Sequence, residues 1–403
     1  MRVHFSSRAF DYQTIRAMAY TTFGGAEPGE VLATVERIDE GDTDAWHARW
    51  LETARRVERL ADDAAEAGNE RTARGAYFRA HTYYRTAEFF LPPADPRRLS
   101  TYDRSREAFR AGLALLDSPT TTLEIPYEGT TLPGYLLLPP DSAGAREPYP
   151  TVVCLGGFDS LAEELYFLCG VPEALARGYA VVLFEGPGQG APLRYQGLTA
   201  RPDWERVVGP VLDHLGDDGR LETEGVGLIG VSFGGYYAPR AAAFEDRVGA
   251  CVAFDHMHDL WRAAAYETPR LARLLLVAPD ALVNGLASAG VRFSVESRWL
   301  LENGKWVFGV DSAAAYQRTL RRYSLSGVAE EIDAPTLVLA GEDDHFVPLE
   351  LAGEFIDKLS CPTTIRVFET AEGAGEHCQV GNLSLATGVI YDWLDDSPVA
   401  EPV

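Results

Sequence analysis

The sequence predicts an α/β protein, in which a mostly parallel sheet flanked by helices follows a helical domain and is interrupted by a helical insertion. Three observations lead to this expectation. Residues 43–117 have helical periodicity and almost no strand signal, short apolar runs alternate with helical segments after residue 121, and about eighty residues between two of these runs contain no convincing strand. Buried parallel strands joined by helices produce continuous apolar runs of this kind.

The first helical region begins with an amphipathic stretch. Apolar residues from Trp46 to Leu60 recur every three or four positions and form one stripe, and Asp42 to Asp44 stand ahead of it as candidate caps. A second predicted helix ends at Pro92, and a third runs to about residue 116. We therefore expect a helical N-terminal lid domain over residues 1–120.

The period changes after this domain. Residues 121–140 are predicted to form two strands around a turn at Glu128 and Gly129. The apolar runs that follow are residues 151–157, 180–186, 226–232, 250–255, 335–344 and 364–369. Residues 256–333, between the fourth and fifth runs, are too long for a plain loop, so we expect a helical cap inserted within a second, α/β domain of residues 121–403.

The composition argues against several classes of protein. Lys and Arg number 36 against 60 Asp and Glu, a net charge of −24 that would repel nucleic acid and anionic membranes. The five cysteines are scattered and form no Cys-x-x-Cys pair, and no stretch approaches the ~20 apolar residues of a membrane span. The start lacks the apolar core of a signal peptide. We expect a cytoplasmic protein with reduced thiols and no metal or cofactor.

The string Gly-Val-Ser-Phe-Gly at residues 230–234 follows an apolar strand and precedes small residues that can open a helix. In such a strand-turn-helix unit the turn is so tight that only glycine fits on either side of the serine. The turn lifts the Ser232 hydroxyl above the sheet and places the Phe233 amide at a helix N-terminus, where it can stabilise negative charge. Ser232 is therefore a candidate nucleophile; the alternative is a structural serine in a βα turn.

A serine needs a base to remove its proton, normally a histidine oriented by a carboxylate. His377 is the best candidate, because it lies in a Gly-rich loop after the last strand. Asp344 follows the preceding strand and is preferred to Asp343 for its spacing from the glycine before it. The chain order of Ser232, Asp344 and His377 is typical of one hydrolase architecture. Asp255, after the fourth run, is the second candidate acid, with a helix cap as its alternative role.

A second donor of the oxyanion hole should come from the loop after the first parallel strand. Gly156 and Gly157 allow the backbone to turn so that the amide of Phe158 faces the site. Ser160 and Glu163 have the spacing of a capping box, which favours a structural role for Glu163. The Gly-rich string at residues 186–190 lacks the Lys-Ser/Thr of a phosphate-binding loop and is expected to shape a loop beside the site.

With these residues in place, the chain resembles the α/β-hydrolase superfamily over residues 121–395. It is most similar to the branch with a helical N-terminal domain, which includes 2,6-dihydroxypseudooxynicotine hydrolase and the fermentation/respiration switch protein family. The supporting strings are AEFFLPPADPR, GGFDSLAEELY, GPGQG, GVSFGG and EGAGEHCQVGN.

The resemblance implies Ser232 as nucleophile, Asp344 as acid, His377 as base, Phe158 and Phe233 as amide donors, and a homodimer. It also implies an extra carboxylate as a proton shuttle in a C–C hydrolase, and Glu267 lies in the right region of the chain for this role.

The leading hypothesis is a serine hydrolase that cleaves an ester, an amide or an activated, β-diketone-like C–C bond of a small hydrophobic or aromatic molecule through an acyl-enzyme. The candidate substrate-binding aromatic residues, which are equally explained as ordinary packing residues, are Tyr77, Tyr84, Tyr166 and Trp261. Two alternatives stay open: an acyl transferase or cyclase with the same triad, and a non-catalytic ligand-binding protein on the same fold.

Overall fold

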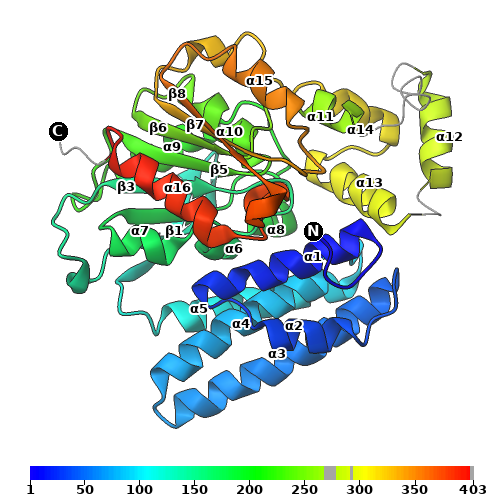
Figure 1. Ribbon diagram of the computed structural model, residues 1–403, viewed down its shortest axis with the longest axis horizontal. Helices are drawn as coiled ribbons and strands as arrows, with labels where there is room; N and C mark the ends of the chain where they lie inside the picture. Colours follow the sequence, from blue (N-terminus) through cyan, green and yellow to red (C-terminus); the bar gives the residue numbers. More distant parts are fainter. Residues whose placement is uncertain (267–277, 291–293, 400–403) are drawn as a thin grey trace. The chain divides into compact units, whose positions relative to one another are not determined.

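The computed structural model describes residues 1–266, 278–290 and 294–399, and within it the chain divides into two units (Figure 1). The first contains Met1–Thr120 together with Gly290–Gly304, and the second contains Thr121–Ala289 and Lys305–Val403. Glu267, the predicted proton shuttle, lies outside the described residues.

The first unit is helical. Its elements are α1 (Arg8–Ala19), η1 (Tyr20–Phe23), α2 (Pro28–Val35), α3 (Thr43–Glu66), α4 (Glu70–Glu88) and α5 (Pro96–Leu113). α3 packs against α4, which packs against α5, and the rings of Trp46, Trp50 and Tyr83 are fully buried among them. The side chain of Asp42 caps α3 by accepting a hydrogen bond from the amide of Ala45. The three long helices were predicted from their periodicity, whereas α1 and α2 were not.

Residues 290–304 belong to the first unit, although the sequence assigns them to the cap of the second. They include most of α13 (Val295–Phe308). The indole of Trp299 stacks on Phe89 at 4.5 Å between ring centroids and donates a hydrogen bond to the backbone oxygen of Phe89. The guanidinium of Arg98 donates to the side-chain oxygen of Asn303. These contacts depend on tertiary packing, which the periodicity of a single helix does not reveal.

The second unit contains an eight-stranded sheet in the order β1-β2-β4-β3-β5-β6-β7-β8. Its strands are β1 (Thr120–Tyr127), β2 (Thr130–Leu137), β3 (Thr151–Leu155), β4 (Ala180–Phe184), β5 (Val226–Val231), β6 (Val248–Phe254), β7 (Thr336–Gly341) and β8 (Thr363–Phe368). The strands β3 to β8 are parallel, and β2 runs antiparallel to β4. All six apolar runs are strands. Five of them, β3 to β7, are almost fully buried, whereas β8 at the end of the sheet is largely exposed or half-buried.

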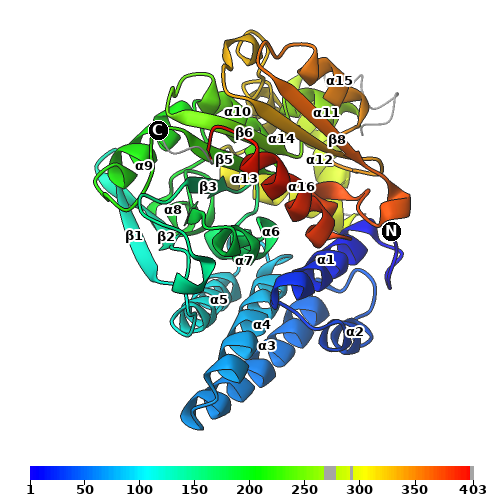
Figure 2. The ribbon, with the colours of Figure 1, turned by 60° about the vertical axis from the view of Figure 1, so that its left-hand side comes forward.

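Helices cover both faces of this sheet. The remaining elements are η2 (Asp141–Ala143), α6 (Ala162–Leu168), α7 (Val171–Ala176), α8 (Gly190–Gln196), α9 (Glu205–Leu215), α10 (Gly234–Ala242), α11 (Leu260–Tyr266), α12 (Asp280–Gly290), α14 (Ala313–Leu320), η4 (Ala329–Glu331), α15 (Glu350–Ile356), η5 (Thr370–Glu372), η6 (His377–Gln379) and α16 (Leu383–Asp395). α9 and α10 lie on one face, and α6, α7 and α16 lie on the other (Figures 1 and 2). Right-handed crossovers between parallel strands require this arrangement.

The sheet order decides where chemistry can occur. β5 has β6 as its neighbour, and β6 in turn pairs with β7, all three running in the same direction. The carboxyl ends of β5, β6 and β7 therefore meet at one edge of the sheet, where open α/β sheets place their ligands. Ser232, Asp255 and Asp344 follow these three strands.

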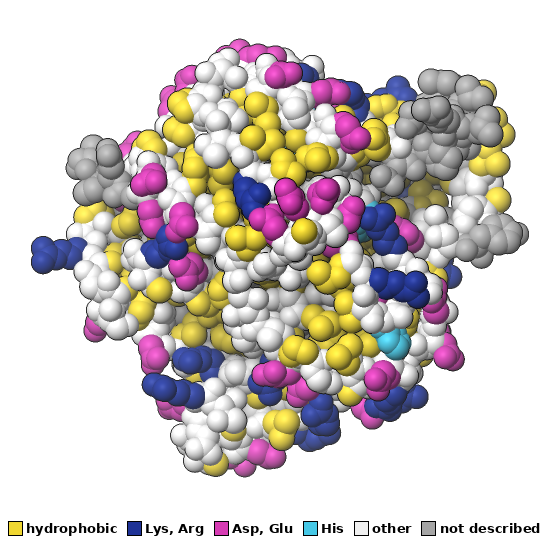
Figure 3. All heavy atoms as spheres, in the orientation of Figure 1, with side chains coloured by type: hydrophobic (Ala, Val, Ile, Leu, Met, Phe, Trp, Pro, Cys, Tyr) yellow, Lys and Arg dark blue, Asp and Glu magenta, His cyan; other side chains and the backbone are white. Residues whose placement is uncertain are grey.

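The surface is acidic but mixed. On the face drawn in Figure 3, the Lys and Arg side chains are dispersed among Asp and Glu side chains. Within the described ranges, no helix has both the length and the apolar character that crossing a bilayer requires.

Candidate active site

The turn after β5 presents Ser232. This residue has a φ of 60°, in the left-handed region, and its amide donates a hydrogen bond of 2.6 Å to the backbone oxygen of Phe254 at the end of β6. A Cβ added to Gly234 would lie 2.8 Å from the backbone oxygen of Leu155, and one added to Gly230 would collide with the oxygen of Gly234. Glycine is therefore required on both sides of the serine, because β3, β5 and α10 approach one another so closely here.

The imidazole of His377 bridges the serine and a carboxylate. Its Nε2 lies 2.8 Å from Oγ of Ser232, and its Nδ1 lies 2.7 Å from Oδ2 of Asp344. His377 is 4% exposed, and Ser232 is only partly buried. With Nδ1 donating to a carboxylate, Nε2 is left as the acceptor for the serine hydroxyl, which is the tautomer that a general base needs. The structure thus brings together the three residues that the sequence singles out.

Asp344, and not its neighbour Asp343, is the carboxylate of the loop after β7 that contacts His377. Its Oδ1 accepts hydrogen bonds from the amides of Phe346 and Val347, at 2.7 and 3.0 Å, which leaves Oδ2 for His377. The carboxylate of Asp343 instead accepts a hydrogen bond from the hydroxyl of Thr370.

Asp255 also faces the imidazole. Its Oδ2 lies 3.0 Å from Nδ1 of His377, and the side chain is fully buried. Burial raises the pKa of Asp255, but the charge of the adjacent His377 and hydrogen bonds from Gln379 and the Cys378 amide outweigh it and lower that pKa to about 2. Burial raises the pKa of Asp344 above its ordinary value, and although His377 opposes this, the charge of Asp255 adds to it. The two candidate acids of the sequence therefore both contact one ring.

The loop after β3 lies beside the nucleophile. A Cβ on Gly157 would approach to 2.8 Å of the Phe233 amide nitrogen and 2.9 Å of the Ser232 Cβ. The side-chain amide of Gln189 donates to the backbone oxygens of Gly156 and Gly157, at 2.6 and 3.2 Å. Because the C=O and N–H of a trans peptide point in opposite directions, the bond to Gly157 also fixes the direction of the next N–H, that of Phe158. The sequence assigned this Gly-rich string only to shaping a loop, so the role of Gln189 was missed.

The capping box predicted in this loop is wrong. The Oγ of Ser160 accepts a hydrogen bond from the amide of Gly157, and the residue at the N-cap of α6 is Leu161. Glu163 accepts a hydrogen bond from the hydroxyl of Tyr135, which is a structural contact of a different kind.

Comparisons with known proteins identify the family. A family model described as the alpha/beta hydrolase family matches residues 152–383, which include the serine, both carboxylates and the histidine. The chain belongs to the α/β-hydrolase family. A hydrolase from a Fusarium species is 37% identical over 412 residues, covering 98% of this chain and 97% of the relative. The 20-hydroxy-prefusarin hydrolase of Gibberella moniliformis is 36% identical over 409 residues, with coverage of 98% and 97%.

A solved structure has the same fold over the whole length. The crystal structure of 2,6-dihydroxy-pseudo-oxynicotine hydrolase superimposes with a TM-score of 0.74, at 24% identity, over 95% of this chain and 96% of that one. This protein is thus an α/β-hydrolase whose helical N-terminal region is also found in its structural neighbour.

The aromatic residues predicted to bind substrate occupy different positions in this α/β-hydrolase. In the first unit the hydroxyl of Tyr84 donates to Glu58 and that of Tyr77 to Asp62. In the second unit Tyr166 is a buried residue of α6, and Trp261 lies on α11 beneath the guanidinium of Arg321. The structure brings none of these four into the hydrogen-bonded group around Ser232.

Other rings do lie near the imidazole and the turn. Phe346 packs edge-on against His377 at 4.9 Å between centroids, and Phe308 lies 6.0 Å from Phe158 and 6.1 Å from Phe233. His345 lies 6.4 Å from the ring of His377. No sequence signal pointed to Phe308, because its contacts with Phe158 and Phe233 join residues far apart in the chain.

One group of side chains has donor atoms spaced for a metal ion. Among the described residues, Asp255, His377 and Cys378 have ligand atoms within 4.8 Å of one another. Burial raises the pKa of the Cys378 thiol to about 11, so it is protonated near neutral pH, and Nδ1 of His377 is already directed at Asp344. Because Nδ1 of His377 is already directed at Asp344, we assign this set of residues no metal.

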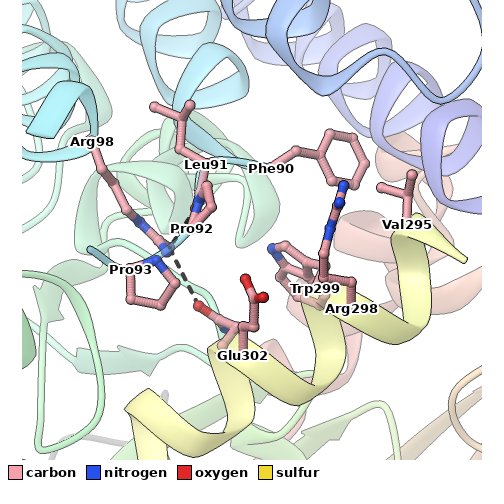
Figure 4. Close-up of a pocket in the computed structure, with 10 residues that line it drawn as sticks. Phe90, Leu91, Pro92, Pro93, Arg98, Val295, Arg298, Trp299 and Glu302 are labelled. Carbon is pink, nitrogen blue, oxygen red and sulfur yellow. Dashed lines mark hydrogen bonds between the residues drawn. The ribbon is translucent and has the colours of Figure 1, made fainter. Parts of the chain in front are cut away.

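The first unit has a small hollow of its own. Figure 4 shows Arg298 and Trp299 of α13 on one side of it and Phe90 and Leu91 on the other. Its accessible volume is about 10 Å³, room for little more than one water molecule and far below the 300–1,000 Å³ of typical ligand sites. None of its lining residues belongs to the group around Ser232, and we assign it no role.

His258 is a buried histidine outside this group. It is 1% exposed, stacks on Phe355, and neither ring nitrogen has a hydrogen-bond partner in the described part of the chain. Burial lowers the pKa of His258 to about 4, and the charges of His256, Lys358 and Arg262 add to this, against Asp259. Because the unfolded chain binds this proton more readily, stability falls as the pH drops from about 6.5 toward 4.

We expect His258→Phe to reduce the acid sensitivity of folding. The wild type should lose about 2 kcal/mol of unfolding free energy at pH 5 relative to pH 8 from this residue alone, and the variant should keep it. Urea denaturation at both pH values measures the difference, with the exposed His4→Gln as the matched control. Equal pH dependence in wild type and His258→Phe would contradict the expectation.

Proposed function

We propose that this α/β-hydrolase is a serine hydrolase in which Ser232 attacks a carbonyl carbon and forms an acyl-enzyme that water then cleaves. The observation that carries the proposal is the single imidazole of His377, which contacts Oγ of Ser232 at 2.8 Å through one nitrogen and Oδ2 of Asp344 at 2.7 Å through the other. Nucleophile, base and orienting acid are thereby linked in one hydrogen-bonded chain.

Each step follows from this arrangement. Nε2 of His377 takes the proton of Ser232 as Oγ bonds to the carbonyl carbon, and Asp344 stabilises the imidazolium. The amides of Phe158 and Phe233 are proposed to donate to the oxyanion. The imidazolium then protonates the leaving atom, which is oxygen for an ester, nitrogen for an amide and carbon for a β-diketone-like substrate. Water, activated by His377 in the same way, releases the acid and restores Ser232.

The substrate is proposed to be a small hydrophobic or aromatic molecule. The ring of Phe346 packs against His377, and the ring of Phe308 lies near the rings of Phe158 and Phe233, so the residues proposed for catalysis have aromatic neighbours. One relative is named as a 20-hydroxy-prefusarin hydrolase, which supports a small organic substrate here as well.

A substrate panel in heavy-oxygen water tests the proposal. The wild type and His377→Ala are assayed in H₂¹⁸O with p-nitrophenyl esters, anilides and β-diketones. The mass of the acid product is then measured by mass spectrometry. We expect an ¹⁸O-labelled acid from the wild type and at least a 10³-fold slower release from His377→Ala. An ester or ring product without the label would mean transfer of the acyl group to another acceptor, and no turnover of any panel member would count against the proposal.

A further inference from the structure

Two carboxylates contact the same nitrogen of His377, and the proposed mechanism uses only one of them. Oδ2 of Asp344 accepts the Nδ1–H hydrogen bond, and Oδ2 of Asp255 lies 3.0 Å from the same Nδ1. They come from the ends of two adjacent strands, β7 and β6. Because the hydrogen bond is directed at Asp344, the contact with Asp255 is chiefly one of charge.

Asp255 is fixed by more than this contact. Its Oδ2 accepts a hydrogen bond of 2.6 Å from the amide of Cys378, and its Oδ1 accepts one of 3.0 Å from the side-chain amide of Gln379. Both donors follow His377 directly in the chain, where Cys378 and Gln379 have φ values of 52° and 46°. An ionised carboxylate with no exposed surface is stable only with such partners.

We propose that Asp255 is a second positioning residue for His377, so that the imidazolium formed when Ser232 attacks is held between two carboxylates. This inference rests on the proposed serine hydrolase function. Asp344 sets the direction of the Nδ1–H bond, and Asp255 supplies a further negative charge that favours the protonated ring in the transition state. It also holds the segment that carries the ring, through Cys378 and Gln379.

The charge of Asp255 can be removed without removing its hydrogen bonds. In Asp255→Asn the amide oxygen can still accept from the Cys378 amide, and the new amide nitrogen would face Gln379. The Oε1 atom of Gln379 is buried and has no partner among the described residues, so a flip of its amide gives the new nitrogen an acceptor. Asp255→Asn is therefore mainly a test of charge.

The pH profile separates this role from a merely structural one. A negative charge beside the imidazole favours its protonated form, so removing the charge keeps the ring neutral to lower pH. We expect the acid limb of kcat/KM to move down by about one pH unit in Asp255→Asn, with a 10- to 100-fold lower plateau. The other titratable groups that contact the ring or lie beside it are Asp344, Cys378 and His345, and Glu376 lies 4.0 Å from Nδ1 of His345. All four are unchanged in this variant.

Asp344→Asn gives a second, independent readout. Loss of the only orienting carboxylate typically costs a triad about 10⁴-fold in kcat. With Asp255 still beside Nδ1, we expect Asp344→Asn to lose only about 10²-fold, and the double variant Asp255→Asn/Asp344→Asn to lose about 10⁴-fold. The measurement on Asp344→Asn alone leaves Asp255 in place and does not require any Asp255 variant to fold.

Gln379→Met is the matched control. It removes the amide that bonds Oδ1 of Asp255 while the carboxylate beside His377 stays, so the acid limb should not move. The proposal would be overturned by an unmoved acid limb of the pH profile in Asp255→Asn, by an equal shift in Gln379→Met, or by a full 10⁴-fold loss in Asp344→Asn alone.

Labelling of the wild type by a fluorophosphonate is carried out before these measurements. Without a Ser232 adduct the serine hydrolase function fails, whereas a labelled Ser232 with any of these three results rejects only the role of Asp255.

Discussion

Replacing Ser232 by alanine is expected to lower kcat by about 10⁵- to 10⁶-fold on any substrate that the wild type turns over. The hydroxyl is the atom that bonds to the carbonyl carbon, and no neighbouring residue of the turn carries another nucleophile. The melting temperature should stay within about 2 °C of the wild type, because Ser232 is partly exposed and alanine meets the same left-handed backbone as serine. Steady-state kinetics and thermal denaturation of the two proteins measure both effects.

The prediction requires two results together, a large loss of activity and an unchanged melting temperature. Loss of activity together with a lower melting temperature would mean that the turn itself had collapsed, which is not the expected outcome. Activity within tenfold of the wild type would show that Ser232 does not attack the substrate.

Gly235→Ala is expected to disrupt both folding and activity. A Cβ at Gly235 would overlap the backbone oxygen of Asp255 and lie 3.4 Å from the amide nitrogen of Met257. The first turn of α10 would have to move away from the end of β6, and Ser232 precedes that turn. We expect the free energy of unfolding to fall by about 3 kcal/mol, and kcat/KM to fall by more than 10²-fold, since about 1 Å of misplacement is costly to catalysis.

Gly388→Ala is the matched control for this change. Gly388 lies inside α16, and a Cβ there would have open space around it. Alanine favours the helix over glycine by up to about 1 kcal/mol, so this variant should be slightly more stable than the wild type and fully active. Urea denaturation and ester hydrolysis of both variants make the comparison. Equal stability of Gly235→Ala and Gly388→Ala would show that α10 and β6 are not so closely packed.

The chain order and turn chemistry were enough to predict that Ser232, Asp344 and His377 meet. Ser232 and Asp344 follow the carboxyl ends of strands with a buried, continuous apolar pattern, and His377 lies in the loop after the more exposed strand β8. Parallel strands bring those ends to one edge of the sheet. The glycines around Ser232 specify a tight turn, because a side chain would meet backbone atoms of neighbouring elements. Each of these constraints selects a residue type at one position, so it can be recognised in a single sequence.

The position of Asp255 beside His377, together with Asp344, could not be recognised from the sequence in this way. The sequence presented it as an alternative to Asp344, whereas the structure places both beside Nδ1 of His377. That outcome depends on β6 lying between β5 and β7, and on the left-handed backbone of Cys378 and Gln379, neither of which is a glycine. Non-glycine residues in that conformation are uncommon and are not recognisable from their type.

Tertiary packing also explains the remaining differences. The helical pattern of residues 290–304 is compatible with either unit. The hydrogen bonds of Trp299 with Phe89 and of Asn303 with Arg98 join this segment to the first unit. Gln189 acts on Gly156 and Gly157, more than thirty residues earlier in the chain, through a contact that only the folded loop creates. The homodimer, the cytoplasmic location and the absence of a cofactor stay predictions of the sequence.

The central claim is that His377 removes the proton of Ser232, and fluorophosphonate labelling followed by peptide mass spectrometry tests it most directly. The account predicts one adduct per chain, on the peptide that contains Ser232, with the adduct absent in Ser232→Ala and formed at least 10³-fold more slowly in His377→Ala. An adduct on another residue, or equal rates in the wild type and His377→Ala, would contradict it.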